Sequence, residues 1–303
     1  MHEIILHHYD MSPYSEKVRL MFGRKNLPWR SVQIPVVMPK PDLTELTGGY
    51  RRTPVMQIGA DIYCDTKICA RVLERLHPQP SLFPGGDEAT VWALSRWAET
   101  SFMMAVTVFF GAGDLFDEAF LEDRKKMAPG IDVSKAGVVT PAKLLQLRAN
   151  LDLLEQQLSD GRAFLLGADP SLADLAAYHT HRFLVVHPTT ASLLAPLKQL
   201  AAWLARVEKI GHGERSELDS ADAIAIARDA APARIEDAPV DLPDGLAVGD
   251  TVTVLPEEAG SGPVSGELVA SGVHEIAIRR RSERAGDVVV HFPREDYLVV
   301  SAG

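Results

Sequence analysis

The first 80 residues constrain the fold of this chain most strongly, because their apolar pattern switches repeatedly between the period of a strand and that of a helix. A short apolar run is followed by an amphipathic segment with a proline in its first turn, and then by a second strand-like run. Two more strand-like runs are joined by a tight Gly-Ala-Asp turn, and a helical segment ended by Pro78 follows them. These segments cover residues 3–8, 12–26, 28–36, 53–66 and 66–78. The order β-α-β and then β-β-α predicts an α/β domain over residues 1–80.

The pattern changes after this domain. Four long segments have the helical period and almost no strand pattern, which predicts an all-α bundle. They lie at residues 87–110, 141–161, 171–186 and 193–209. A stretch rich in Ala, Asp, Glu and Pro at 212–243 indicates a further helix and a linker. We therefore assign residues 88–230 to the helical domain.

The end of the chain changes character once more. From residue 244 onward, five short β-branched runs are separated by Gly, Pro and Asp. This spacing predicts a small all-β domain over residues 244–303, of the SH3-like barrel type.

Length and charge limit the function classes. The chain has 303 residues and a formal net charge of −10, so we expect several domains and no attraction of the whole chain to nucleic acid or to an anionic membrane. Four arginines at 279–281 and 284 lie in a segment that is net acidic, and we interpret them as a solvated strand edge. No apolar run is long enough to span a bilayer, and no basic leader with an apolar core precedes the first strand. We expect a cytoplasmic protein with neither a membrane nor a nucleic-acid partner.

The two cysteines, Cys64 and Cys69, are five residues apart. They cannot form a disulfide framework or a zinc site by themselves, so we expect two buried small side chains and no metal.

Four short motifs occur in order along the first two predicted domains. The turn after the first strand, Ser12-Pro13-Tyr14-Ser15, has the spacing of a redox Cys-Pro-Tyr-Cys motif with a hydroxyl in place of each thiol. Thr53-Pro54 and Asp65-Thr66 come next, the second at the start of a helix. The fourth, "GADPSLADLAAY", begins a helix of the bundle with a variant of the capping box formed by Ser171 and Asp174.

With these motifs, residues 1–210 resemble the glutathione S-transferase family, and in particular its Ser-type members. The resemblance implies a thioredoxin-like N-terminal domain, an all-α C-terminal domain and glutathione as co-substrate. It also implies a homodimer that activates the glutathione thiol for attack on a hydrophobic electrophile. The family does not account for the predicted β-domain.

The resemblance implies that Ser12 contacts the glutathione sulfur. A free thiol has a pKa of about 8.5, and lowering it by two units requires about 2.7 kcal/mol of selective stabilisation of the anion. A hydroxyl donor at the N-terminal end of a helix can supply this, and unlike a thiol it cannot form a mixed disulfide. Tyr9 and Ser15 remain alternative sulfur ligands.

The other motifs match the remaining parts of glutathione. The resemblance implies a cis peptide bond before Pro54, with the backbone of Thr53 pairing with the cysteinyl part. Asp65 and Thr66 match the pair that binds the γ-glutamyl end, although the family more often has Glu-Ser there. Arg52, or its neighbour Arg51, is placed to pair with the glycine carboxylate.

Met103, Met104 and Phe110 lie on the first long helix of the bundle, which lines the electrophile pocket in the family. Residues of these types also build ordinary cores, so both interpretations stay open for them. Two other functions also remain open. One is a non-catalytic glutathione-binding or regulatory protein with the same fold, and the other is an isomerase or dehalogenase of the same superfamily.

Overall fold

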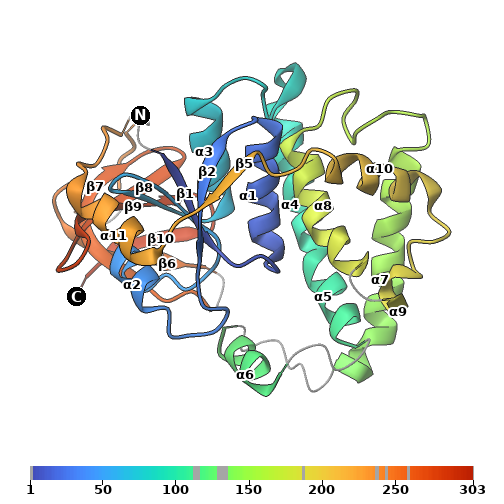
Figure 1. Cartoon of the computed structure of the whole chain (residues 1–303), viewed down its shortest axis with the longest axis horizontal. Coiled ribbons are helices and arrows are strands. Elements are labelled where there is room, and N and C mark those ends of the chain that lie inside the picture. The colour runs from blue at the N-terminus through green and yellow to red at the C-terminus, as the bar shows by residue number, and fades with distance from the viewer. Residues whose placement is uncertain are drawn as a thin grey trace.

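The structure, a computed structural model, describes residues 3–111, 117–127, 136–185, 188–235, 239–242, 245–257 and 260–302. A sheet-containing half and a helical half lie side by side, with α1 and α3 between the strands and the bundle (Figure 1). None of the described helices is long and apolar enough to cross a membrane.

The N-terminal part has the predicted thioredoxin-like arrangement. Strand β1 pairs in parallel with β2 and antiparallel with β3, and β3 pairs antiparallel with β4. The strands are β1 (Ile4–His8), β2 (Pro28–Gln33), β3 (Val55–Ile58) and β4 (Asp61–Cys64), and the helices are α1 (Pro13–Arg24), α2 (Pro41–Thr47) and α3 (Thr66–Leu76). Cys64 and Cys69 are both free and buried.

Helix α2 begins in a stretch with two prolines, Pro39 and Pro41. Pro41 occupies the first turn of α2, where the missing N–H of proline needs no partner, so this proline begins a helix instead of breaking one. The helix ends at Gly48, whose φ of 77° suits a left-handed C-cap.

The helical half contains α4 (Glu88–Thr100), α5 (Phe102–Phe110), α6 (Glu118–Met127), α7 (Ala136–Gln157), α8 (Leu172–Val185), α9 (Pro188–Ala191) and α10 (Lys198–Glu208). The helix predicted over 87–110 is interrupted at Ser101, between α4 and α5. Ser101 is fully buried, and its hydroxyl accepts a hydrogen bond of 2.9 Å from Asn150 of α7. The interruption therefore lies at a packing contact between helices.

The capping box at the start of α8 is structural, as expected. The Asp174 carboxylate is fully buried and accepts bonds of 2.8 to 2.9 Å from the Leu165 and Ser171 backbone N–H groups, the Ser171 hydroxyl and the Trp203 indole. These donors satisfy a buried carboxylate that would otherwise be costly.

The chain returns from the bundle to the sheet. Strand β5 (Glu214–Glu217) pairs in parallel with β2, and α11 (Ser220–Asp229) contacts α2 and β9. Residues 214–229 therefore pack on the sheet half, although the sequence analysis grouped them with the helical domain.

The predicted C-terminal strands are present as β6 (Thr251–Pro256), β7 (Val264–Ser271), β8 (Glu275–Ser282), β9 (Gly286–Pro293) and β10 (Tyr297–Ser301). Strands β6 to β9 form an antiparallel meander, and β10 returns to pair with β6. Strand β9 also pairs in parallel with β4, which joins all the strands into one sheet of order β10-β6-β7-β8-β9-β4-β3-β1-β2-β5. Since β9 and β10 are not paired among the described strands, the SH3-like barrel is not confirmed.

Candidate functional site

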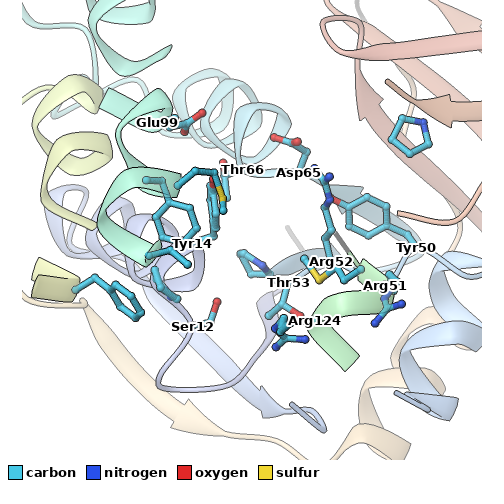
Figure 2. A pocket seen from close by; sticks show the side chains of 18 of the residues that line it. Ser12, Tyr14, Tyr50, Arg51, Arg52, Thr53, Asp65, Thr66, Glu99 and Arg124 are labelled. Atoms are coloured by element: carbon cyan, nitrogen blue, oxygen red, sulfur yellow. The ribbon is translucent and has the colours of Figure 1, made fainter. Parts of the chain in front are cut away.

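A cavity of about 590 Å³ opens where the sheet half meets the bundle, and residues of the C-terminal strands also line it. Figure 2 shows side chains from the β1–α1 turn, the segment before β3 and the start of α3 around it. Most of the predicted site residues line this cavity: Tyr9, Ser12, Arg52, Thr53, Pro54, Asp65, Thr66, Met103 and Phe110. Ser15 and Met104 are not among the lining residues.

Ser12 combines the geometry of a helix cap with a position on the cavity wall. Its extended backbone precedes α1, and its hydroxyl oxygen accepts a bond of 3.2 Å from the backbone N–H of Ser15. A hydroxyl that accepts one bond still has its own hydrogen to donate. The N-terminal end of α1 adds a favourable field for a negative charge at this point.

The other two candidate sulfur ligands differ in their access to the cavity. Ser15 is fully buried within α1, and its backbone N–H serves the cap at Ser12. The Tyr9 hydroxyl lies at the cavity and accepts a bond of 3.1 Å from the Arg124 guanidinium.

The peptide bond between Thr53 and Pro54 is cis, as the family resemblance implied. The Lys40 ammonium donates to the Thr53 hydroxyl at 3.0 Å and to the Arg51 carbonyl at 3.2 Å. Burial lowers the pKa of Lys40 to about 8, and repulsion from Arg124 and Arg51 contributes in the same direction. A lysine of this kind is a ready donor to a ligand carboxylate near neutral pH.

Two arginines, Arg51 and Arg52, precede Thr53, and both line the cavity. Arg51 pairs with Asp123 at 2.8 Å, and Arg124 pairs with the same carboxylate. Together with Lys40, these arginines give the cavity wall several cations that can pair with a ligand carboxylate.

Asp65 has a backbone conformation that is unusual for a residue other than glycine, with φ of 90°. Its side chain caps α3 by accepting a bond of 2.9 Å from the Lys67 backbone N–H. Burial raises the pKa of Asp65, while the charge of Lys67 opposes this effect. Such a backbone costs about 1–3 kcal/mol and is concentrated at ligand sites. Thr66, nearly buried, follows at the first position of the helix.

The opposite wall of the cavity is apolar and lies on the bundle. It contains Phe102, Met103, Val106, Phe110, Phe120 and Phe183. Met104 instead packs against the hydrophobic core, with its sulfur 3.8 Å from the Asn150 amide nitrogen. Of the three residues predicted for an electrophile pocket, Met103 and Phe110 therefore line the cavity and Met104 does not.

Several lining residues were missed by the sequence analysis, notably Lys40, Arg124, Asp296 and Tyr297. No local motif marks them, because each reaches the cavity only through tertiary packing. Among the described residues, no group of three or more His, Cys, Asp or Glu side chains could hold a metal ion.

Comparisons with known proteins agree with this geometry. Family models described as "Glutathione S-transferase, N-terminal domain" and "Glutathione S-transferase, C-terminal domain" match residues 6–81 and 138–206. The crystal structure of a GST-like protein from Pseudomonas syringae is 43% identical in sequence, with a TM-score of 0.84. The match covers 99% of this chain and 100% of that one, so it includes the C-terminal strands.

More distant relatives match only part of the chain. The FtsZ-localized protein A of Caulobacter vibrioides is 26% identical over 181 residues, which are 58% of this chain and 74% of that protein. A glutathione S-transferase structure from Rhodospirillum rubrum F11 is 21% identical, with a TM-score of 0.52 over 68% of this chain and 87% of that one. The second match shows a likeness of fold.

Proposed function

This chain belongs to the glutathione S-transferase family, and from that premise we propose that it activates the thiol of glutathione for attack on a hydrophobic electrophile. The observation that carries the proposal is the position of Ser12, which caps α1 and faces the same cavity as Thr53 and Asp65.

Ser12 acts in this proposal as a hydrogen-bond donor and not as a nucleophile. The thiol of bound glutathione loses its proton to water, and the Ser12 hydroxyl and the N-terminal end of α1 stabilise the thiolate. The thiolate sulfur then forms a bond to an electrophilic carbon, whose leaving group departs with its electron pair. Ser12 keeps its own proton throughout.

The remaining residues position the tripeptide. The backbone of Thr53 pairs with the cysteinyl part, and Asp65 and Thr66 hold the γ-glutamyl end. Arg52 and Lys40 hold the glycine carboxylate at the other end of the cavity. The electrophile lies against the apolar wall formed by residues such as Met103 and Phe110.

The proposal also covers properties of the whole protein. It includes a cytoplasmic location, and the family supports a homodimer. Because the edge of β4 is already paired with β9 of the same chain, a dimer must form through other surfaces. The division into domains at 1–80, 88–230 and 244–303, with a barrel-like last domain, stays a proposal as well, in which residues 214–229 leave the bundle and pack on the sheet half.

A non-catalytic role is the second candidate. It is favoured by the similarity to a protein that is named for its localisation with FtsZ and not for a reaction. In this case the cavity would bind glutathione without conjugation.

Titration of glutathione by calorimetry, followed by a conjugation assay with 1-chloro-2,4-dinitrobenzene, separates the two candidates. We expect the wild type to bind and turn over, and Ser12→Ala to lose turnover by about a hundredfold, as oxyanion-hole donors do. Ser12→Asp retains a helix cap but has no hydrogen to donate, so it should be equally slow. Ser15→Ala is the matched control and should stay close to wild type.

Binding without turnover by the wild type would favour the non-catalytic role. Absence of glutathione binding would contradict both candidates.

A further inference from the structure

The turn between β9 and β10 brings two polar residues of the C-terminal strands to the cavity. Asp296 and Tyr297 both line it, and Tyr297 is only 4% exposed. More than 220 residues separate them from Asp65 and Thr66, which lie at the same end of the cavity.

We propose that Asp296 and Tyr297 complete the subsite for the γ-glutamyl end of glutathione, so that the appended strands supply its outer wall from within the same chain. The ligand class is a free α-amino acid group, which carries an ammonium and a carboxylate on one carbon. This inference rests on the proposed binding of glutathione and extends it.

Tyr297 is a positioning residue for Asp65. Its hydroxyl lies 3.3 Å from the second carboxylate oxygen of Asp65 and 3.4 Å from the hydroxyl of Tyr50. A phenol has one hydrogen, so a chain of bonds in which Tyr50 donates to Tyr297 and Tyr297 donates to Asp65 satisfies all three groups. A donor to the carboxylate favours its ionised form, which offsets the cost of burying that charge. Figure 2 shows Tyr50 and Asp65 on the same side of the cavity.

Asp296 adds a second carboxylate to this wall and holds two cations. It forms an ion pair with Lys67 of α3 and lies 3.2 Å from Arg96 of α4. Carboxylates and cations therefore alternate along Asp65, Lys67, Asp296 and Arg96. This pattern matches a zwitterion, whose ammonium needs a carboxylate and whose carboxylate needs a cation or helix N–H groups.

The turn is fixed against the rest of the molecule. The Asp296 carbonyl accepts a bond of 2.9 Å from the Glu257 backbone N–H, and Glu295 lies 3.6 Å from Arg71 of α3. Pairing of β9 with β4 anchors the preceding strand. The two side chains are thus held in place before a ligand arrives, which lowers the entropy cost of binding.

Calorimetry with S-methylglutathione tests the inference, since this ligand has no thiol and reports binding alone. We expect Asp296→Asn and Tyr297→Phe each to weaken its binding about tenfold, as expected for loss of a hydrogen bond or contact with a charged group. The matched control is Glu295→Gln, which removes the neighbouring carboxylate outside the cavity lining and should change the affinity less than about twofold.

A second ligand distinguishes recognition from a general disturbance of the fold. In the glutaryl analogue of S-methylglutathione, hydrogen replaces the γ-glutamyl ammonium. We expect the wild type and Asp296→Asn to bind this analogue with similar affinity, because the interaction that the variant removes is already missing.

Three outcomes would overturn the inference. If both variants bind S-methylglutathione as tightly as the wild type does, the inference is wrong but the proposed function is not affected. If the variants lose affinity for S-methylglutathione and for the glutaryl analogue equally, the two residues have a structural role instead. If the wild type does not bind S-methylglutathione at all, the proposed function fails and the inference fails with it.

Discussion

At the scale of single residues, Ser12 can cap a helix and hold a sulfur at the same time because a hydroxyl both accepts and donates. Its oxygen accepts a hydrogen bond from the Ser15 N–H, and its own hydrogen can be donated to a ligand in the cavity. This double capacity explains why the motif alone could not separate a structural serine from a functional one. A thiol at the same position would form disulfides, and a carboxylate would repel the thiolate.

Lys40 gives a prediction at the same scale. Its ammonium has a pKa of about 8, so its charge is lost as the pH rises through this value. We expect wild-type affinity for S-methylglutathione to fall more steeply between pH 7 and pH 9 than that of Lys40→Arg, because arginine stays charged throughout. At pH 7, Lys40→Met should bind about tenfold more weakly than wild type.

Calorimetric titrations at both pH values measure these differences. Deprotonation of the ligand ammonium is common to all variants and cancels in the comparison. Identical pH profiles for wild type and Lys40→Arg would show that Lys40 does not face the glycine carboxylate.

At the scale of elements, a buried histidine joins the appended strands to the thioredoxin-like sheet. His291 of β9 bonds Asp61 of β4 at 3.0 Å and also contacts Glu275 of β8, and all three are at most 4% exposed. Burial alone would lower the pKa of His291, but its bonds to Asp61 and Glu275 outweigh this effect and raise the pKa above 6.5. The protonated histidine therefore stabilises the folded protein.

The sign of the pH dependence follows from this raised pKa. The stabilisation is fully present below the unfolded value of 6.5 and is lost as the pH rises through the folded value. We expect the stability difference between wild type and His291→Asn to be larger at pH 6 than at pH 9, by about 1.4 kcal/mol for each unit by which the pKa is raised. Urea unfolding at the two pH values measures it.

His274→Gln is a suitable control, since this histidine lies in the turn before β8 and is exposed. Its substitution should change the stability by less than about 0.5 kcal/mol, as is usual for exposed positions. A difference for His291→Asn that grows with pH would contradict the assignment of a charged histidine.

At the scale of the whole molecule, the sequence predicted individual elements better than their partners. Each C-terminal strand has its own β-branched run and was found in place, whereas the pairing of β9 with β4 depends on two edges that meet only in the folded chain. The same reason explains why β5 and α11 were grouped with the bundle although they pack on the sheet half. Local pattern does not specify which edge a strand joins.

The candidate site divides in the same way. Ser12, the cis bond at Pro54 and Asp65 belong to short motifs, and the structure brings them to one cavity. Tyr297 carries no motif and could not be predicted, because its contact with Asp65 requires the appended strands to fold onto α3. Which of Met103 and Met104 lines the cavity could not be predicted either, because it depends on how α5 is rotated against α7.

The central claim is that the Ser12 hydroxyl keeps the sulfur of bound glutathione ionised, and the pKa of that thiol tests it most directly. It can be measured from the ultraviolet absorbance of the thiolate while the pH is varied in the presence of saturating glutathione. We expect a bound-thiol pKa about two units below the free value of about 8.5 in the wild type and in Ser15→Ala, and a value close to the free one in Ser12→Ala. An equally lowered pKa in Ser12→Ala would contradict the claim.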